Sequence, residues 1–565
     1  MLLIGLSWIY ILFTSVNLGF GFHKMIGIKN AGLLISVISG LFSASLIGCF
    51  WAIFGRVNFE FHIFLLLLNA GICFRFRHEV NHLYQTFWTQ LKQLILPLQL
   101  FLSIIAVLIV AQCTTAPFVI DNESSYIQTI KWINEYGFVK GLANLHIALG
   151  QASGWHITQS VFSFSFLYKN FNDLSGFCLL IGNCFAVIKL NDYFLDANKN
   201  ALIAGLFPLA NVFFFQLISA PSPDIPVYVC AFVLFYYFIE TFKNADISDL
   251  NLLMALAFFI FFVKVTSVGL VLVPVILLVT HFRKFAAKLL PVALLGIVVL
   301  ALFIVKNSII SGLPLFPTGY FKLATVDFAV PDSMLQFYTD SGKMCIFSQT
   351  RKQLHAMDFG QFALAWLFAS KVTGFFNTVT VLILAMTPVF IYRYFNRKAL
   401  WIVYFVSIIV LGILLLSSPV YRYFIYLTFF LGFFIFGCVF STKRLILTAY
   451  GLSILAAGIV LFFPINFDSL TKNNLISQNS PFSVSNTIFP HQNSKLGNQY
   501  ELVQKGNLIY YSPQGNPFFW ATGDGNLPCV NKLQINYNEN YFSVIPQMRT
   551  QNLSDGFYSK KINPE

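Results

Sequence analysis

Residues 399–417 read Ala-Leu-Trp-Ile-Val-Tyr-Phe-Val-Ser-Ile-Ile-Val-Leu-Gly-Ile-Leu-Leu-Leu-Ser and contain no charged side chain. An α-helix of about 20 mostly apolar residues is long enough to cross the hydrocarbon core of a bilayer. This stretch therefore predicts a membrane-spanning helix. Similar stretches recur through most of the sequence, so the fold class that we expect is an all-α polytopic membrane protein.

The composition leads to the same expectation. The chain has 565 residues, of which 57% are hydrophobic and only 10% charged, and its mean hydropathy is +0.73. A soluble domain usually carries about 25% charged residues. The composition therefore excludes a water-soluble globular enzyme.

Hydropathy along the chain predicts about fourteen membrane-spanning helices. They are expected at residues 2–22, 31–54, 59–74, 94–116, 174–191, 201–219, 225–242, 250–265, 267–282, 289–305, 373–392, 399–417, 423–440 and 445–463. The first stretch lacks a basic region before it and a clear cleavage site, which favours a retained span over a signal peptide.

The net charge of +13 is dispersed over short loops and forms no basic stripe, so nucleic acid is not an expected partner. Short cytoplasmic loops of membrane proteins are rich in Lys and Arg. Here every second loop is basic, which predicts that both termini lie outside the cytoplasm. The basic residues of these loops are Lys24, Lys29, Arg75, Arg77, Lys92, Lys189, Lys199, Lys243, Arg283, Lys284, Lys288, Arg393, Arg397, Lys398, Lys443 and Arg444.

Three long polar segments then fall on the non-cytoplasmic side, at residues 117–173, 306–372 and 464–565. A helical region precedes each of them, at residues 1–116, 174–305 and 373–463. In the last polar segment, residues 508–511 are strand-prone and residues 533–537 alternate apolar and polar side chains. We therefore expect a small extracytoplasmic C-terminal domain of α+β or other β-containing type.

The nine cysteines form no metal-binding or disulfide framework, because most lie inside apolar stretches. Cys345 and Cys529 are both expected outside the cell interior. In an oxidising compartment this pair could form a disulfide.

The first polar segment contains the strongest candidate for chemistry. Asp121 and Glu123 directly follow a predicted span, and apolar residues at helical spacing come next, at Ile127, Ile130 and Ile133. This spacing predicts a helix along the membrane surface. A carboxylate at that boundary could act as a general base between an aqueous acceptor and a lipid-linked reactant. The alternative is that Asp121 only caps the following helix.

Further candidates lie at the outer ends of spans. Asp224 follows Ser219-Ala-Pro-Ser-Pro223 and either caps a helix or faces the outer side. Lys306 and Arg422 are expected on the non-cytoplasmic side, where basic residues are less common. Binding of an anionic phosphate would explain them. The alternative is that they only extend from helix ends into water. Asn144 and His146 could bind sugar hydroxyls, or the histidine could only pack.

With these residues the chain resembles the GT-C glycosyltransferases, multi-span enzymes that use polyprenyl-phosphate-linked sugars, and more closely a group of bacterial GT-C-like membrane proteins. The similarity touches most of the chain from about residue 115 onward. The stretches that carry it are Asp121 with Gln128-Thr-Ile-Lys-Trp132, Glu135-Tyr-Gly137 through Gly141-Leu-Ala-Asn-Leu-His146, Lys306-Asn307 with Ser311-Gly-Leu-Pro314, and Leu527-Pro-Cys529.

The resemblance implies a catalytic Asp in the first large outer loop, which corresponds to Asp121. Two features depart from the family pattern: several spans precede this loop, and Glu123 occupies a position where a small residue is expected. Which carboxylate is the base therefore stays open. The resemblance also implies a bacterial plasma-membrane enzyme with a polyprenyl-phosphate sugar as donor and a glycan, lipid or protein as acceptor.

The chemistry expected from this resemblance is inverting sugar transfer. Asp121 would deprotonate the acceptor, and Lys306 or Arg422 would stabilise the departing phosphate. Glu123, Asp224, Asn144 and His146 are the further candidates for substrate binding. No cofactor is certain, but Asp121 and Glu123 together could bind Mg²⁺ or Mn²⁺.

Two other functions remain open. A transporter or flippase would place ionisable groups near the bilayer midplane, whereas the charges here cluster at span ends. A polymerase or ligase for lipid-linked glycans would act from the same side and is expected to use arginines of a large outer loop. Arg351 is the only arginine in residues 306–372. A scaffold role is also compatible with the sequence.

Overall fold

A computed structural model describes residues 1–29, 31–169, 173–323, 325–471, 477–497 and 499–562. Among these residues, ten helical segments are long and apolar enough to cross a membrane, or up to twelve if each of two bent pairs is one span. The ten are α1 (Leu2–Ile26), α2 (Leu33–Ala52), α5 (Leu96–Cys113), α9 (Leu174–Asp196), the run α10–η3–α11 (Lys199–Ile218), α12 (Asp224–Thr241), α16 (Leu290–Ser311), α20 (Lys371–Tyr394), α21 (Lys398–Ser417) and α23 (Lys443–Phe462).

The bent pairs each turn by nearly a right angle. In the first, α3 (Phe59–Arg75) meets α4 (Arg77–Lys92) at 89°. In the second, the segment formed by η4 (Val265–Val271) and α14 (Leu272–Thr280) meets α15 (Phe282–Phe285) and η5 (Ala286–Lys288) at 86°. Two apolar helices, α13 (Ile247–Val263) and α22 (Ile425–Val439), are shorter. Each predicted apolar stretch is thus helical, while the total of fourteen spans stays a prediction.

Close helix packing in the bundle depends on small residues. A Cβ added to Gly19 of α1 would lie 1.8 Å from the Ser36 carbonyl oxygen of α2, and one added to Gly40 would lie 1.7 Å from that of Ser15. The two backbones therefore touch where both helices present small side chains, which is a common way to associate helices in a bilayer.

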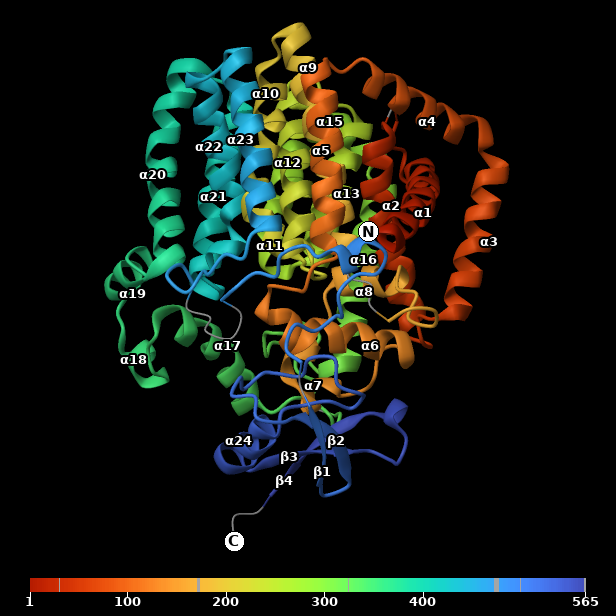
Figure 1. The fold of residues 1–565 in the computed structure, drawn as a ribbon, viewed down its shortest axis with the longest axis vertical. Coiled ribbons are helices and arrows are strands. Elements are labelled where there is room, and N and C mark those ends of the chain that lie inside the picture. The colour runs from red at the N-terminus through yellow and green to blue at the C-terminus, as the bar shows by residue number, and fades with distance from the viewer. Residues whose placement is uncertain (30, 170–172, 324, 472–476, 498, 563–565) are drawn as a thin grey trace.

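The three long polar segments lie together at one end of the bundle (Figure 1). We call this the polar end. The Met1 amino group donates to the Asn486 carbonyl at 2.7 Å, so the start of the chain lies there as well. The first two segments contain η1 (Asn122–Tyr126), α6 (Ile127–Glu135), α7 (Leu142–Leu145), η2 (Ile147–Gln151), α8 (Gly154–Val161), α17 (Asp332–Phe347), α18 (Arg351–Ala356) and α19 (Phe359–Leu367).

The C-terminal segment contains two small antiparallel sheets. In one sheet β1 (Tyr500–Lys505) pairs with β2 (Leu508–Pro513), and in the other β3 (Val544–Met548) pairs with β4 (Phe557–Lys561). The other elements of this segment are η7 (Val484–Thr487), α24 (Lys532–Phe542) and η8 (Leu553–Asp555). The predicted β-containing C-terminal region is therefore present.

Two local predictions were wrong, and one disulfide that the sequence left open is not formed. Residues 533–537 belong to α24, because the Asn531 side chain accepts from the Leu533 N–H and caps a helix. The helix after Asp121 exists as α6, but its apolar residues Ile127, Ile130 and Ile133 are buried in protein and do not lie on the membrane surface. Cys345 is exposed and Cys529 buried, and among the described residues neither forms a disulfide.

Candidate functional site

Four charged residues from distant parts of the chain meet at the polar end, and we call them the charged cluster: Asp121, Asp224, Lys264 and Arg422. Arg422 lies in η6 (Tyr421–Tyr423), the turn between α21 and α22. Its Nη2 is 2.6 Å from Asp121 Oδ2, and its Nη1 is 3.7 Å from Asp224 Oδ2. One guanidinium thus bridges two carboxylates.

Lys264 completes the cluster from the break between α13 and η4. Its ammonium forms an ion pair with Asp224 Oδ1 and lies 3.5 Å from the centroid of the Tyr423 ring. Asp224 also accepts a hydrogen bond from Ser222 Oγ at 3.3 Å. Because its side chain is only 2% exposed, Asp224 depends on these partners for its charge to be tolerated.

Asp121 is the most open member of the cluster, with 37% of its side chain exposed. It immediately precedes the π-helical turn η1 and makes no helix-capping hydrogen bond. Its Oδ2 accepts from Arg422 and from the Tyr126 hydroxyl, the latter at 3.5 Å. The capping interpretation therefore fails for Asp121, and likewise for Asp224, which is the first residue of α12 and follows its N-cap Pro223.

The cluster is electrically balanced, since two carboxylates face two cations. Burial lowers the pKa of Arg422, but the neighbouring Asp121 and Asp224 more than offset this and raise it well above its ordinary value. Arg422 therefore keeps its positive charge. Burial, with Asp121 next, also raises the pKa of Tyr126, so its hydroxyl stays a hydrogen-bond donor.

Glu123 lies two residues from Asp121 but has other partners. Its Oε2 accepts from Ser494 Oγ at 2.5 Å and its Oε1 from the Lys495 N–H at 2.9 Å. Its backbone carbonyl accepts from the N–H groups of Thr522 and Gly523. Glu123 thus fastens the C-terminal segment to η1 and does not join the charged cluster.

The predicted joint cation site does not fit this arrangement. The Glu123 carboxylate faces residues 494–495, whereas Asp121 faces Arg422, so the two share no hydrogen-bond partner. Within the described part of the chain, no group of three or more His, Cys, Asp or Glu is placed to hold a metal ion. We therefore derive no step through a metal.

Asn144 and His146 are also engaged by protein groups. The Asn144 amide donates to the Phe328 carbonyl at 2.7 Å and accepts from Ser559 Oγ at 2.7 Å. His146 Nδ1 accepts from the Ala148 N–H at 3.2 Å, and its Nε2 is 3.3 Å from the Trp520 carbonyl. Burial lowers the pKa of His146 to about 4, so it is neutral at pH 7.

Lys306 is buried in α16, and its ammonium donates to the Ala152 carbonyl at 2.8 Å. It makes no ion pair among the described residues, and the structure does not bring it into the charged cluster. Of the predicted site residues, the structure therefore unites Asp121, Asp224 and Arg422 and separates Glu123, Asn144, His146 and Lys306.

Lys264 and the tyrosines at positions 126 and 423 were not among the predicted site residues. Lys264 interrupts a long apolar stretch, and an ionisable residue in such a stretch is by default a candidate for function. Tyr423 directly follows Arg422, so its proximity was also readable from the sequence. No such signal was available for Tyr126.

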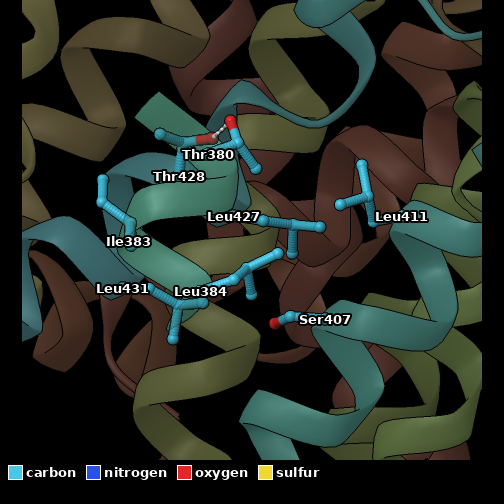
Figure 2. A pocket seen from close by; sticks show the side chains of 8 residues that line it. All are labelled: Thr380, Ile383, Leu384, Ser407, Leu411, Leu427, Thr428 and Leu431. Atoms are coloured by element: carbon cyan, nitrogen blue, oxygen red, sulfur yellow. Dashed lines mark hydrogen bonds between the residues drawn. The ribbon is translucent and has the colours of Figure 1, made fainter. Parts of the chain in front are cut away.

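An apolar hollow lies among α20, α21 and α22, and two of its lining residues, Leu427 and Thr428, lie in the first turn of α22 (Figure 2). Side chains of α20, α21 and α22 line it, and the space between them is too narrow to admit a water molecule. Its hydroxyls are satisfied internally, since Thr380 Oγ1 and Thr428 Oγ1 are 2.6 Å apart and Ser407 Oγ donates to the Val403 carbonyl. The hollow therefore offers a hydrocarbon surface. Its lining is Thr380, Ile383, Leu384, Ser407, Leu411, Leu427, Thr428 and Leu431.

Comparison with known proteins gives a family. The family model described as "Domain of unknown function (DUF8201)" matches residues 1–430, and the chain belongs to this family. No curated protein matches the chain, and no solved structure does. The whole charged cluster lies within the matched residues. The C-terminal segment, whose residues contact η1, lies outside them.

Proposed function

We propose that this member of the family is an integral plasma-membrane glycosyltransferase of GT-C type. It would transfer a sugar from a polyprenyl-phosphate donor to an acceptor on the non-cytoplasmic side. The observation that carries the proposal is the ion pair between Asp121 and Arg422 at the polar end. It puts a partly exposed carboxylate, suited to accept a proton, next to a cation suited to bind phosphate.

The donor phosphate binds between Arg422 and Lys264. Arginine pairs well with phosphate oxygens because its N–H groups form a planar fork. Asp224 stays behind both cations and fixes their positions. When phosphate takes a share of the Arg422 N–H groups, the Asp121 carboxylate loosens from its partner and can accept a hydrogen bond from the acceptor hydroxyl.

In the transfer step the acceptor oxygen attacks the anomeric carbon while the bond from that carbon to the phosphate oxygen breaks. The hydroxyl proton moves to Asp121, and the phosphodiester leaves as a polyprenyl phosphate with one additional negative charge. Because Asp121 loses its charge in the same step, Arg422 can turn its full charge to the leaving phosphate. A single attack from the face opposite the phosphate inverts the configuration at the anomeric carbon. Because phosphate is a good leaving group, no acid is needed to protonate it.

The donor's hydrocarbon chain has a suitable surface close by. Leu427 and Thr428 lie in the first turn of α22, directly after the turn that holds Arg422. They belong to the apolar hollow of Figure 2. A polyprenyl chain could enter there only if α20, α21 and α22 moved apart, because the space between their side chains does not admit a water molecule.

The test compares the lipid-linked and surface glycans of cells with and without the gene by mass spectrometry. Loss of one sugar on deletion, restored by the wild-type gene, is the expected result. The Asp121→Asn variant should fail to restore it, with a loss of about 100-fold or more. Glu123→Gln is the matched control and should restore most of the sugar, because the Glu123 carboxylate accepts from Asn122, Ser494 and Lys495 and does not contact Arg422. Unchanged glycans on deletion, or an active Asp121→Asn variant, would refute the proposal.

A lipid carrier is the second candidate, favoured by Lys264 at the break between α13 and η4. Interrupted helices that present ionisable groups are typical of transporter binding sites. A carrier would leave the lipid-linked sugar chemically intact and change only its leaflet. Accumulation of that lipid in the inner leaflet on deletion, with no loss of transferase activity in membranes, would favour this function.

A further inference from the structure

A second recess at the polar end lies apart from the charged cluster. It is formed where η2, α17 and the C-terminal segment meet, and it contains about 250 Å³ of space, any opening to solvent included. Its walls combine three aromatic rings, from Phe337, Phe519 and Trp520, with two amides, from Gln534 and Asn538 of α24. We call it the aromatic recess.

The rings form a connected platform. Phe519 and Trp520 meet edge to face with centroids 4.8 Å apart, and Phe337 lies 6.1 Å from Trp520 at an interplanar angle of 32°. All three side chains are partly exposed. The platform therefore offers both ring faces and ring edges to a ligand.

The two amides supply the polar part. Gln534 donates from Nε2 to the Phe519 carbonyl at 3.1 Å, which fixes the orientation of its amide. Asn538 is 8% exposed, and its side chain makes no hydrogen bond to any residue that the structure describes. Its amide is therefore available to a ligand in the recess.

The chemistry of the lining restricts the ligand. None of the lining residues is charged, so the recess suits a neutral group. It is narrow, with room inside for about one water molecule, so only a hydroxyl or hydroxymethyl group can enter while the rest of the ligand lies on the rings. A pyranose has this pattern, since its C–H face is apolar and its edge carries hydroxyls.

The recess is connected to Asp121 through Tyr338. The Tyr338 ring lies 6.0 Å from the Trp520 ring. Burial raises the pKa of Tyr338, and the neighbouring Tyr423 and Asp121 raise it further, so its phenol lies within electrostatic reach of the charged cluster. A ligand in the aromatic recess would therefore lie at the same polar end as Asp121.

We propose that the aromatic recess is a saccharide subsite that binds the acceptor, with Trp520 and Phe519 stacking on a sugar ring and Asn538 and Gln534 bonding its hydroxyls. This assignment of the acceptor as a glycan rests on the proposed transferase function. The sugar-binding step itself does not require transfer and can be measured alone.

The test is saturation-transfer NMR on the full-length protein in lipid nanodiscs, since maltoside detergents would themselves compete for a sugar site. The probes are the methyl glycosides of glucose, galactose, mannose and N-acetylglucosamine. We expect transfer to at least one glycoside, strongest at the protons of one ring face. Asn538→Ala should weaken its binding about tenfold, and Trp520→Leu should weaken it further.

Asn536→Ala is the matched control, because Asn536 is an exposed asparagine of the same helix and should bind like the wild type. Asp121→Asn should also bind fully, so a failure of the transferase proposal would leave this result intact. Absence of binding to every probe by the wild type would overturn the subsite. The subsite would also be overturned if Asn538→Ala and Trp520→Leu bound the glycosides as tightly as the wild type does. Thermal unfolding of both variants checks that they are folded.

Discussion

Asp224 has the most enclosed carboxylate of the charged cluster, and its charge is balanced by Lys264 and Arg422. Breaking a buried ion pair leaves one charge uncompensated, whereas replacing both partners removes the problem. We therefore predict that Lys264→Met destabilises the fold by about 3–5 kcal/mol. The double variant Lys264→Met with Asp224→Asn should recover most of that loss. Unfolding of the purified single and double variants measures both changes, and additive losses would contradict the ion-pair account.

Glu123 allows a prediction about pH. Burial raises its pKa above the ordinary value of 4.5, although hydrogen bonds from Ser494, Lys495 and Asn122 oppose the shift, and the Asp524 carboxylate adds a small further rise. The folded state therefore binds the proton more tightly than the unfolded state. The stability that protonated Glu123 contributes is fully present below pH 4.5 and is lost as the pH rises through the raised pKa.

The measurement compares unfolding temperatures of the wild type and Glu123→Gln over the acid range. Wild-type stability should fall relative to the variant as the pH rises above the ordinary value for a carboxyl, because the glutamine cannot ionise. Curves that stay parallel over the whole range would show that Glu123 is not desolvated in the folded state.

At the scale of elements, the turn that carries Asp121 is held by the C-terminal segment. Gln128, on α6, donates to the carbonyls of Gly523 and Gly525 at 3.2 and 2.8 Å, and Thr522 Oγ1 donates to the Ser124 carbonyl at 2.9 Å. These bonds join residues almost 400 positions apart. The segment outside the family match thus fixes the geometry of a residue inside it.

Removing one of these contacts should loosen the turn. Gln128→Leu keeps a similar volume but leaves the Gly523 carbonyl without its side-chain donor and the Gly525 carbonyl with Lys131 alone, so we predict a destabilisation of about 1–3 kcal/mol. Transfer activity should fall as well, because Asp121 directly precedes the loosened turn. Gln90→Leu, at an exposed position of α4, is the control and should change stability by less than about 0.5 kcal/mol. Equal unfolding temperatures for the two variants would show that the Gln128 contacts are dispensable.

Helices and strands could be predicted from the sequence where a single contribution to the free energy dominates. Apolar stretches such as residues 399–417 have no stable alternative to a helix in a bilayer, and α21 covers Lys398–Ser417. Prediction failed where tertiary contacts decide. Residues 533–537 alternate like a strand, yet the Asn531 cap and the burial of Ile535 select a helix. The apolar face of α6 matched a membrane surface equally well, and only its protein neighbours decided otherwise.

At the scale of the whole molecule, the site could be predicted in part. Charge type and position at span ends identified Asp121, Asp224 and Arg422 one by one, but not that Arg422 would reach across 301 positions to Asp121. The same reasoning selected Lys306, His146 and Glu123, which are engaged by protein groups. The sequence shows which side chains need partners, whereas the path of the chain between helices decides which partners they receive.

Orientation in the membrane is the property of the whole molecule on which the proposed function depends. Both ends of the described chain lie at the polar end, and the connection from α4 to α5 lies at the opposite end (Figure 1). Because the basic loops lie at that opposite end, we predict that the polar end is non-cytoplasmic. Alkaline phosphatase fused after residue 565 should then be active, and a green fluorescent protein fused after residue 93 should fluoresce. The reverse pattern would put Asp121 and Arg422 in the cytoplasm, away from any outer acceptor, and would overturn the proposed reaction along with the topology.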